Sequence, residues 1–196
     1  DKNIRSAFLK SYKSDPKSAF GGIILLNRKV NFKLAQYISE HFFEMIVAPS
    51  FDKNALTSLK EKRNLIILKL PKSKKQTKEH RSTLFGDLYQ TVDLEKINKK
   101  FLELQSNKKV SLKLINDLIF SLKVAKHLKS NAIVLSRNKQ TIGLGHGNTN
   151  RVDALKIAIK NMNKYFSLYH WFITLVCFIT VCTPLSSDGK NPKVIK

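Results

Sequence analysis

The chain has 196 residues, of which 42% are hydrophobic and 26% charged, and this balance excludes an intrinsically disordered protein. Lysine and arginine (36) outnumber aspartate and glutamate (14), and the formal net charge of +22 would attract nucleic acid, an anionic membrane or phosphorylated small molecules. The cations are mostly lysines spread along the whole chain. The densest runs, residues 72–78 and 96–100, have few aromatic neighbours, which argues against a nucleic-acid-binding module.

The two cysteines, Cys177 and Cys182, lie in one apolar stretch without a Cys-x-x-Cys pair or a nearby histidine cluster. This arrangement argues against zinc and against a disulfide framework, and it fits a reducing compartment. The chain begins Asp1-Lys2-Asn3, with neither an apolar signal segment nor an initiator methionine. We therefore expect a cytoplasmic polypeptide that is a fragment of something longer.

In chain order, the first half alternates short apolar runs with helical patterns. A buried strand is predicted at residues 22–26. Asn31 can then cap a helix to about Phe43 that buries Leu34, Ala35, Ile38 and Phe42. Further apolar runs predict a buried strand at 45–48, a helix at 53–62 and a strand at 65–70. Strands that alternate with helices in this way predict a parallel α/β layer.

After a polar, basic loop at residues 71–78, the next strong pattern is an amphipathic helix over residues 111–129, ended by Ser130-Asn131. Two strands, 132–135 and 141–144, are predicted around a turn at 137–140, followed by a helix over 150–165. The predicted buried face of the first helix comprises Leu114, Ile115, Leu118, Ile119, Leu122 and Ala125.

Residues 168–182 are nearly all apolar, but they are fewer than the roughly 20 needed to span a bilayer. A buried segment, a re-entrant piece and a translated non-coding sequence all fit this stretch. A short membrane-attached protein is therefore an alternative function, beside the nucleic-acid-binding module.

Four residues sit where a ligand contact is chemically reasonable, and each also has a purely structural interpretation. Gly21 precedes a strand, where its backbone could approach a ligand or simply form a tight turn. Glu44 could accept hydrogen bonds from ribose hydroxyls, or be a solvated charge at a helix end. Asn131 offers a donor and an acceptor, although from the residues alone a helix C-cap is the favoured interpretation. Arg151 opens a helix after a glycine-rich run, a position suited to an anion.

The run Gly143-Leu144-Gly145-His146-Gly147 lacks the third glycine and the later acidic residue of a dinucleotide-binding fingerprint, so that function is excluded. Three stretches, in order and separation, instead carry a family resemblance: residues 14–28 around Phe20-Gly21-Gly22, residues 43–49 and residues 123–153. Together they resemble the aminoimidazole-carboxamide ribonucleotide (AICAR) formyltransferase domain of the bifunctional purine-biosynthesis enzymes, over about residues 10–166.

The resemblance implies an α/β fold with a layered α/β/α sheet of the cytidine-deaminase-like type, incomplete at both ends. Residues 1–166 would be a partial formyltransferase domain, and residues 167–196 an unmatched apolar tail, suspected to be a gene-model artefact. Substrate-binding residues would be Gly21, Glu44, Asn131 and Arg151, and Val152 would lie by the folate.

The implied reaction transfers a formyl group from the co-substrate 10-formyltetrahydrofolate to the 5-amino group of AICAR, without a metal. The family's catalytic Lys-His pair would lie upstream of Asp1, so no catalytic residue is expected here and the fragment alone should be inactive. The full-length protein would also carry inosine monophosphate (IMP) cyclohydrolase activity in IMP biosynthesis. It would form a homodimer, and neither nucleic acid nor membrane is expected as a partner.

One loop departs from the family pattern Gly-Ala-Gly-Gln-x-Ser-Arg, because this chain has His146, Asn148 and Asn150. We interpret His146 as a loop variant, since the alanine it replaces has no proton chemistry. His127 is interpreted as a helix-end residue that is favourable near the negative end of the helix dipole.

Overall fold

The computed structural model describes residues 1–71, 77–105, 107, 109–166 and 176–177, and these form two compact units. The inserted unit comprises Lys17–Lys96. The outer unit comprises Asp1–Pro16 together with the chain from Ile97 onward.

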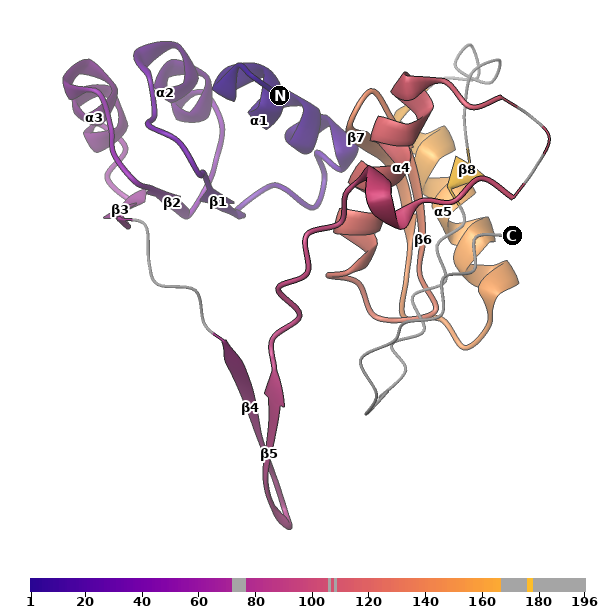
Figure 1. The fold of residues 1–196 in the computed structure, drawn as a ribbon. Helices are drawn as coiled ribbons and strands as arrows, with labels where there is room; N and C mark the ends of the chain where they lie inside the picture. The colour runs from indigo at the N-terminus through magenta and orange to yellow at the C-terminus, as the bar shows by residue number, and fades with distance from the viewer. Residues whose placement is uncertain (72–76, 106, 108, 167–175, 178–196) are drawn as a thin grey trace. The chain divides into compact units, whose positions relative to one another are not determined.

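The inserted unit is a small α/β layer of the predicted kind (Figure 1). Three parallel strands pair in the order β1-β2-β3, with Ile23 opposite Met45 and Met45 opposite Ile66. Asn31 caps α2 as expected, because its side chain accepts a hydrogen bond from the Leu34 N–H at 3.0 Å. The elements are β1 (Ile23–Leu25), α2 (Phe32–Ser39), β2 (Met45–Ala48), α3 (Lys53–Lys60) and β3 (Ile66–Lys69).

The apolar runs predicted buried strands, but only one face of this sheet is buried. Ile46 is fully buried, whereas Ile23 and Leu25 are 66% and 72% exposed. The two crossovers run in the same direction along the sheet, so α2 and α3 cover the same face (Figure 1). The opposite face therefore carries exposed apolar side chains, among them Ile66 and Leu68.

Helix α2 is also shorter than predicted, and this changes the position of one aromatic ring. It ends at Ser39, where Glu40 is its C-cap, rather than near Phe43. Phe42 was expected on the buried helical face, but it is 47% exposed and packs against Phe20, with ring centroids 5.0 Å apart.

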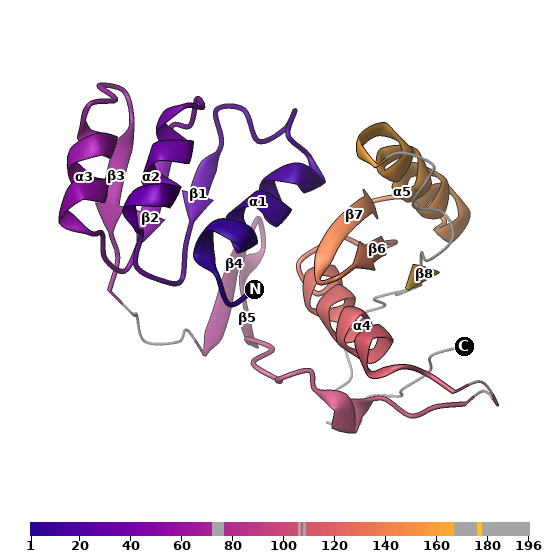
Figure 2. The ribbon, with the colours of Figure 1, turned by 90° about the horizontal axis from the view of Figure 1, so that it is seen from above.

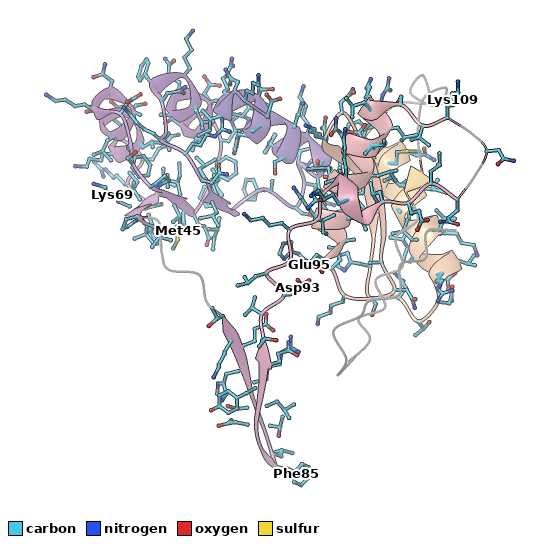
Figure 3. All side chains as sticks on the ribbon, in the orientation of Figure 1. Met45, Lys69, Phe85, Asp93, Glu95 and Lys109 are labelled. Atoms are coloured by element: carbon cyan, nitrogen blue, oxygen red, sulfur yellow. The ribbon has the colours of Figure 1, made fainter. Side chains whose placement is uncertain are left out.

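An antiparallel hairpin, β4 (Lys78–Thr83) and β5 (Gly86–Thr91), was not predicted and begins at the last residue of the expected loop. Leu84 and Phe85 form its two-residue tip and are almost completely exposed, and Figure 3 labels Phe85 there. Figure 3 also labels Met45 and Lys69, the first residue of β2 and the last residue of β3.

In the outer unit, one helix packs on each face of an antiparallel pair of strands (Figure 2). Helix α4 contacts β6, and helix α5 contacts both β7 and β6, so β6 is buried along most of its length. The predicted turn is a two-residue one in which Asn138 and Lys139 have φ of 52° and 55°. The elements are α1 (Ile4–Ser14), the 3₁₀ turn η1 (Lys99–Phe101), α4 (Leu112–Ala125), β6 (Ile133–Arg137), β7 (Gln140–Gly145), α5 (Arg151–Tyr165) and β8 (Val176–Cys177).

Helix α1 was not predicted, and side-chain hydrogen bonds attach it to β7. The Ser14 hydroxyl donates to the Thr141 carbonyl at 2.7 Å, and the Thr141 hydroxyl donates back to Ser14 Oγ at 2.7 Å. Gln140 Nε2 donates to the Lys10 carbonyl at 3.0 Å. These contacts join the start of the chain to a strand more than 120 residues later.

The buried residues of α4 are Asp117, Ser121 and Ala125, and only Ala125 was predicted. The predicted leucines and isoleucines are half-buried, so the most deeply buried face is largely polar. The Asp117 carboxylate accepts the N–H groups of Asn138 at 2.9 Å and Lys139 at 2.7 Å. Asp117 thereby joins α4 to the β6–β7 turn, since its carboxylate satisfies both turn amides.

Replacement of Asp117 with alanine should lower the free energy of unfolding by about 2–3 kcal/mol, since it leaves two turn amides without their charged acceptor. Urea denaturation would measure the loss. Asp117→Asn retains one acceptor oxygen and should lose less. An unchanged urea midpoint for Asp117→Ala would show that the carboxylate does not hold this turn.

Candidate functional site

The predicted site residues fall into two groups, one in each unit. Gly21 and Glu44 lie in the inserted unit, and Asn131, Arg151 and Val152 lie in the outer unit.

Gly21 occupies a turn that only glycine adopts easily. Its φ is +68°, and its N–H donates to the Phe42 carbonyl at 3.1 Å. A Cβ at this position would lie 3.3 Å from Phe42 Cε1 and 3.8 Å from Glu44 Oε1. The tight-turn interpretation is therefore confirmed, and the turn leaves the backbone of Gly21 beside the Glu44 carboxylate.

Glu44 lies at the amino end of β2, five residues beyond the end of α2, so it is not the helix-end charge that the sequence allowed. Its backbone is fixed on both sides, because its N–H donates to the Gly22 carbonyl at 3.2 Å and its carbonyl accepts from Ile66 N–H at 2.9 Å. The side chain is exposed, and its carboxylate has no hydrogen-bond partner among the described residues. A firmly placed, unpaired carboxylate is suited to accepting hydrogen bonds from hydroxyl groups.

A shallow cleft of about 390 Å³ lies at the same amino edge of the sheet. Phe42 lines it and also contacts Gly21, so the cleft adjoins the Gly21–Glu44 pair. Lys62 and Arg63, which line the cleft, follow the C-cap of α3, Glu61, and offset the negative end of that helix dipole. Their position therefore does not by itself require an anionic ligand.

Asn131 is not a helix C-cap, because α4 ends at Ala125 and the cap residue is Lys126. Nor does Asn131 have a left-handed backbone, which among the described non-glycine residues only Asn138 and Lys139 adopt. Its Nδ2 donates to the carbonyls of Asn148 and Thr149, each at 3.0 Å. The Oδ1 atom has no hydrogen-bond partner in the described part of the chain and remains available as an acceptor.

Arg151 is the first residue of α5, and its exposed guanidinium makes no hydrogen bond or ion pair with the described residues. Asn150 caps the helix: its Oδ1 accepts from Asp153 N–H at 2.8 Å and its Nδ2 donates to Asp153 Oδ2 at 2.5 Å. The N–H groups of Arg151 and Val152, which an α-helix cannot satisfy internally, remain at this end. Cation and amides together suit an anionic group.

The three departures from the family loop pattern differ in consequence. Asn150 performs the capping that a serine would perform at that position, so the helix start is preserved. The Asn148 side chain donates to the His146 carbonyl at 3.0 Å and stays within the loop. His146 itself is exposed.

Close packing on β7 fixes the body of α5, the helix that Arg151 opens. A Cβ on Gly145 would overlap the Ala154 carbonyl oxygen, and one on Gly143 would overlap the Ala158 carbonyl oxygen. Both alanines are fully buried. Because no side chain separates helix from strand along this glycine–alanine seam, the helix can occupy only one depth on the sheet.

The Phe20–Phe42 pair is the feature of the site that the sequence interpretation missed. Phe20 is 74% exposed and lies directly before Gly21 in the chain. The only signal in the sequence was an aromatic residue directly before two glycines, and Phe42 had been assigned to a buried helix face.

No group of three or more metal-ligating side chains occurs among the described residues.

No helix within the described ranges is long and apolar enough to cross a membrane. The apolar stretch at 168–182, on which the membrane alternative rests, lies outside the described residues except for Val176 and Cys177.

Comparison with known proteins assigns the class. Residues 1–161 match the profile of the AICARFT/IMPCHase bienzyme, and the chain belongs to this family. The predicted family resemblance is thereby confirmed.

Similar proteins include the bifunctional purine biosynthesis proteins PurH of Oceanobacillus iheyensis, 42% identical over 160 residues, and of Acetivibrio thermocellus, 44% identical over 162 residues. The PurH of Persephonella marina is 40% identical over 162 residues. Each match covers 81% of this chain but only 31–32% of the relative. The chain thus spans about a third of the length of the relatives it matches.

The seam should tolerate almost no added volume. Gly145→Ala should lower the free energy of unfolding by about 3 kcal/mol, because the new methyl group meets backbone rather than a flexible side chain. Gly147→Ala is the matched control. Gly147 has a φ of +68° but open space around it, so the loss should be about 1 kcal/mol. Equal losses in thermal or urea unfolding would contradict the seam.

Proposed function

We propose that this chain supplies nucleotide-binding residues for formyl transfer from 10-formyltetrahydrofolate to AICAR. One observation carries the proposal: an unpaired arginine, Arg151, stands at the capped start of a helix whose depth is fixed by glycines, within a chain of the AICARFT/IMPCHase bienzyme family.

In this proposal Arg151 and the first amides of α5 hold an anionic group of the nucleotide. A guanidinium presents a planar fork of donors, and a helix start adds partial positive charge, so both favour a phosphate. Asp153, the acidic residue of the first turn, is already bonded to Asn150 and lies 3.6 Å from Lys156 Nζ. Its charge is therefore partly offset and competes little with the ligand.

The remaining proposed contacts use donors and acceptors that have no hydrogen-bond partner among the described residues. Glu44 is an acceptor for the ribose hydroxyls, beside the backbone of Gly21. Asn131 faces the ligand with Oδ1 alone, so the group it meets must be a donor, as the 5-amino or carboxamide N–H₂ of AICAR is. Val152 is 60% exposed at the same helix end and is the proposed neighbour of the folate.

Binding is only part of formyl transfer. The 5-amino group is a weak nucleophile, because its lone pair is delocalised into the ring and the carboxamide. The reaction therefore needs a base near the amine, a donor for the developing oxyanion and close alignment of both substrates. The residues assigned above bind and orient the substrates. We propose that the catalytic Lys-His pair of the family lies outside this sequence.

The wider assignments are proposals of the same kind. Residues 1–166 would form part of a formyltransferase domain distinct from 167–196, in a cytoplasmic homodimer that also has IMP cyclohydrolase activity. The finer fold assignment, a cytidine-deaminase-like α/β/α sheet, would require a layer over the exposed face that carries Ile23 and Leu25. That requirement is reasonable, because parallel sheets are almost always covered on both faces.

The purified chain mixed with AICAR and 10-formyltetrahydrofolate should release no tetrahydrofolate above the rate without protein. The residues assigned to the ligand contribute binding groups but no general base aimed at the amine. Absorbance of the folate product gives the measurement. Turnover by the chain alone would refute the assignment of catalysis to residues outside it.

Arg151→Ala should weaken AICAR binding about tenfold or more, as expected for loss of a charge-assisted contact. Titration calorimetry with AICAR and with its dephosphorylated riboside separates the groups involved, because only the nucleotide should be affected. Lys160→Ala removes an exposed cation from the same helix and should change neither affinity. An equal loss for the riboside would place Arg151 away from the phosphate.

A further inference from the structure

The segment before β6 and the loop before α5 are joined by four hydrogen bonds, and Asn131 makes three of them. Gly147 N–H donates to the Lys129 carbonyl at 2.8 Å, and Asn131 N–H donates to the Asn148 carbonyl at 3.1 Å. The Asn131 side chain adds the two bonds from Nδ2, to Asn148 and to Thr149. Both hydrogens of the side-chain amide are therefore engaged.

The orientation of this amide follows from its surroundings. Two carbonyl oxygens face the same terminal atom, so that atom must be the nitrogen. The opposite orientation would set an oxygen against two oxygens, with no hydrogen between them.

The loop that Asn131 holds has few other attachments. His146, Gly147, Thr149 and Asn150 are exposed, and a Cβ on Gly147 would meet nothing within 4 Å. The glycine–alanine seam fixes the body of α5, but it begins at Ala154, beyond the helix start. The carbonyls held by Asn131 belong to the two residues directly before the N-cap Asn150.

We propose that Asn131 is a positioning residue for Arg151, in addition to any contact of its Oδ1 with ligand. Its side-chain amide acts as a latch that ties the loop at 146–150 to the start of β6, so that the first turn of α5 and its arginine are held in place before a ligand arrives. The functional consequence rests on the proposed function, but the latch itself requires no ligand. A side chain that served only to contact substrate would leave the empty loop unchanged when removed.

Amide hydrogen exchange of the full chain without ligand tests the latch directly. In Asn131→Ala, exchange of the Gly147 N–H should accelerate about 30-fold, as loss of two hydrogen bonds implies, while amides of β6 and β7 keep their protection. The backbone order parameter of Arg151 should fall from about 0.85 to below 0.6. Unchanged values at Gly147 and Arg151 would overturn the proposal.

Thr149→Ala is the matched control. It retains the carbonyl that Asn131 holds and removes only an exposed side chain, so exchange at Gly147 should stay as in the parent chain. Acceleration in both variants would mean that the loop is generally loose, and it would also overturn the latch. If Asn131→Ala does not fold, Asn131→Ser, which can donate one hydrogen bond at most, replaces it with the same criteria and a smaller expected acceleration.

A double-mutant cycle then tests the link to Arg151. If Asn131 acts through Arg151, the loss of AICAR affinity in Asn131→Ala with Arg151→Ala should be clearly smaller than the product of the two single losses. A combined loss equal to that product would overturn the link. If the parent chain binds no AICAR, the proposed function fails, whereas the exchange measurement still decides the latch.

Discussion

The contact on which the candidate site depends most is the direct approach of α5 to β7. Gly143 and Gly145 present no side chain to the helix, and Ala154 and Ala158 present the smallest one that a helix favours. Backbone therefore rests on backbone, and the depth of the helix is set by hard contact rather than by adaptable side chains. This contact sets the depth of the helix whose first residue is Arg151.

Around this contact the outer unit is held by buried polar groups as much as by apolar packing. Asp117 accepts the two amides of the β6–β7 turn, and Ser121 and Ser136 share a hydrogen bond of 2.6 Å beside it. Such groups are costly to bury unless they are paired, so they allow only one alignment of α4 on the strands. The same logic recurs at Asn131, where an amide satisfied by two carbonyls aligns the loop that leads into α5.

Much of the fold was predictable from the sequence, because apolar periodicity is a local property. The parallel alternation from Ile23 to Lys69 and the hairpin from Ile133 to Gly145 both have clear patterns. The β4–β5 hairpin was not predictable, since its strands are polar and Leu84-Phe85 are not typical turn residues. The buried face of α4 was misplaced because Asp117 and Ser121 are buried only through partners that lie 15 to 22 residues away.

Family motifs identified the candidate residues, but not what holds them. That Gly21 lies beside Glu44 follows from the turn at φ +68°, and that the donors of Asn131 are already engaged follows from a loop 17 residues away. The central proposal is that Gly21, Glu44, Asn131 and Arg151 contact AICAR. Titration of the isotopically labelled chain with AICAR, followed by NMR, tests it most directly. Chemical-shift changes are expected to concentrate at these four residues. Changes spread over the exposed lysines, or none at these four residues, would contradict the proposal.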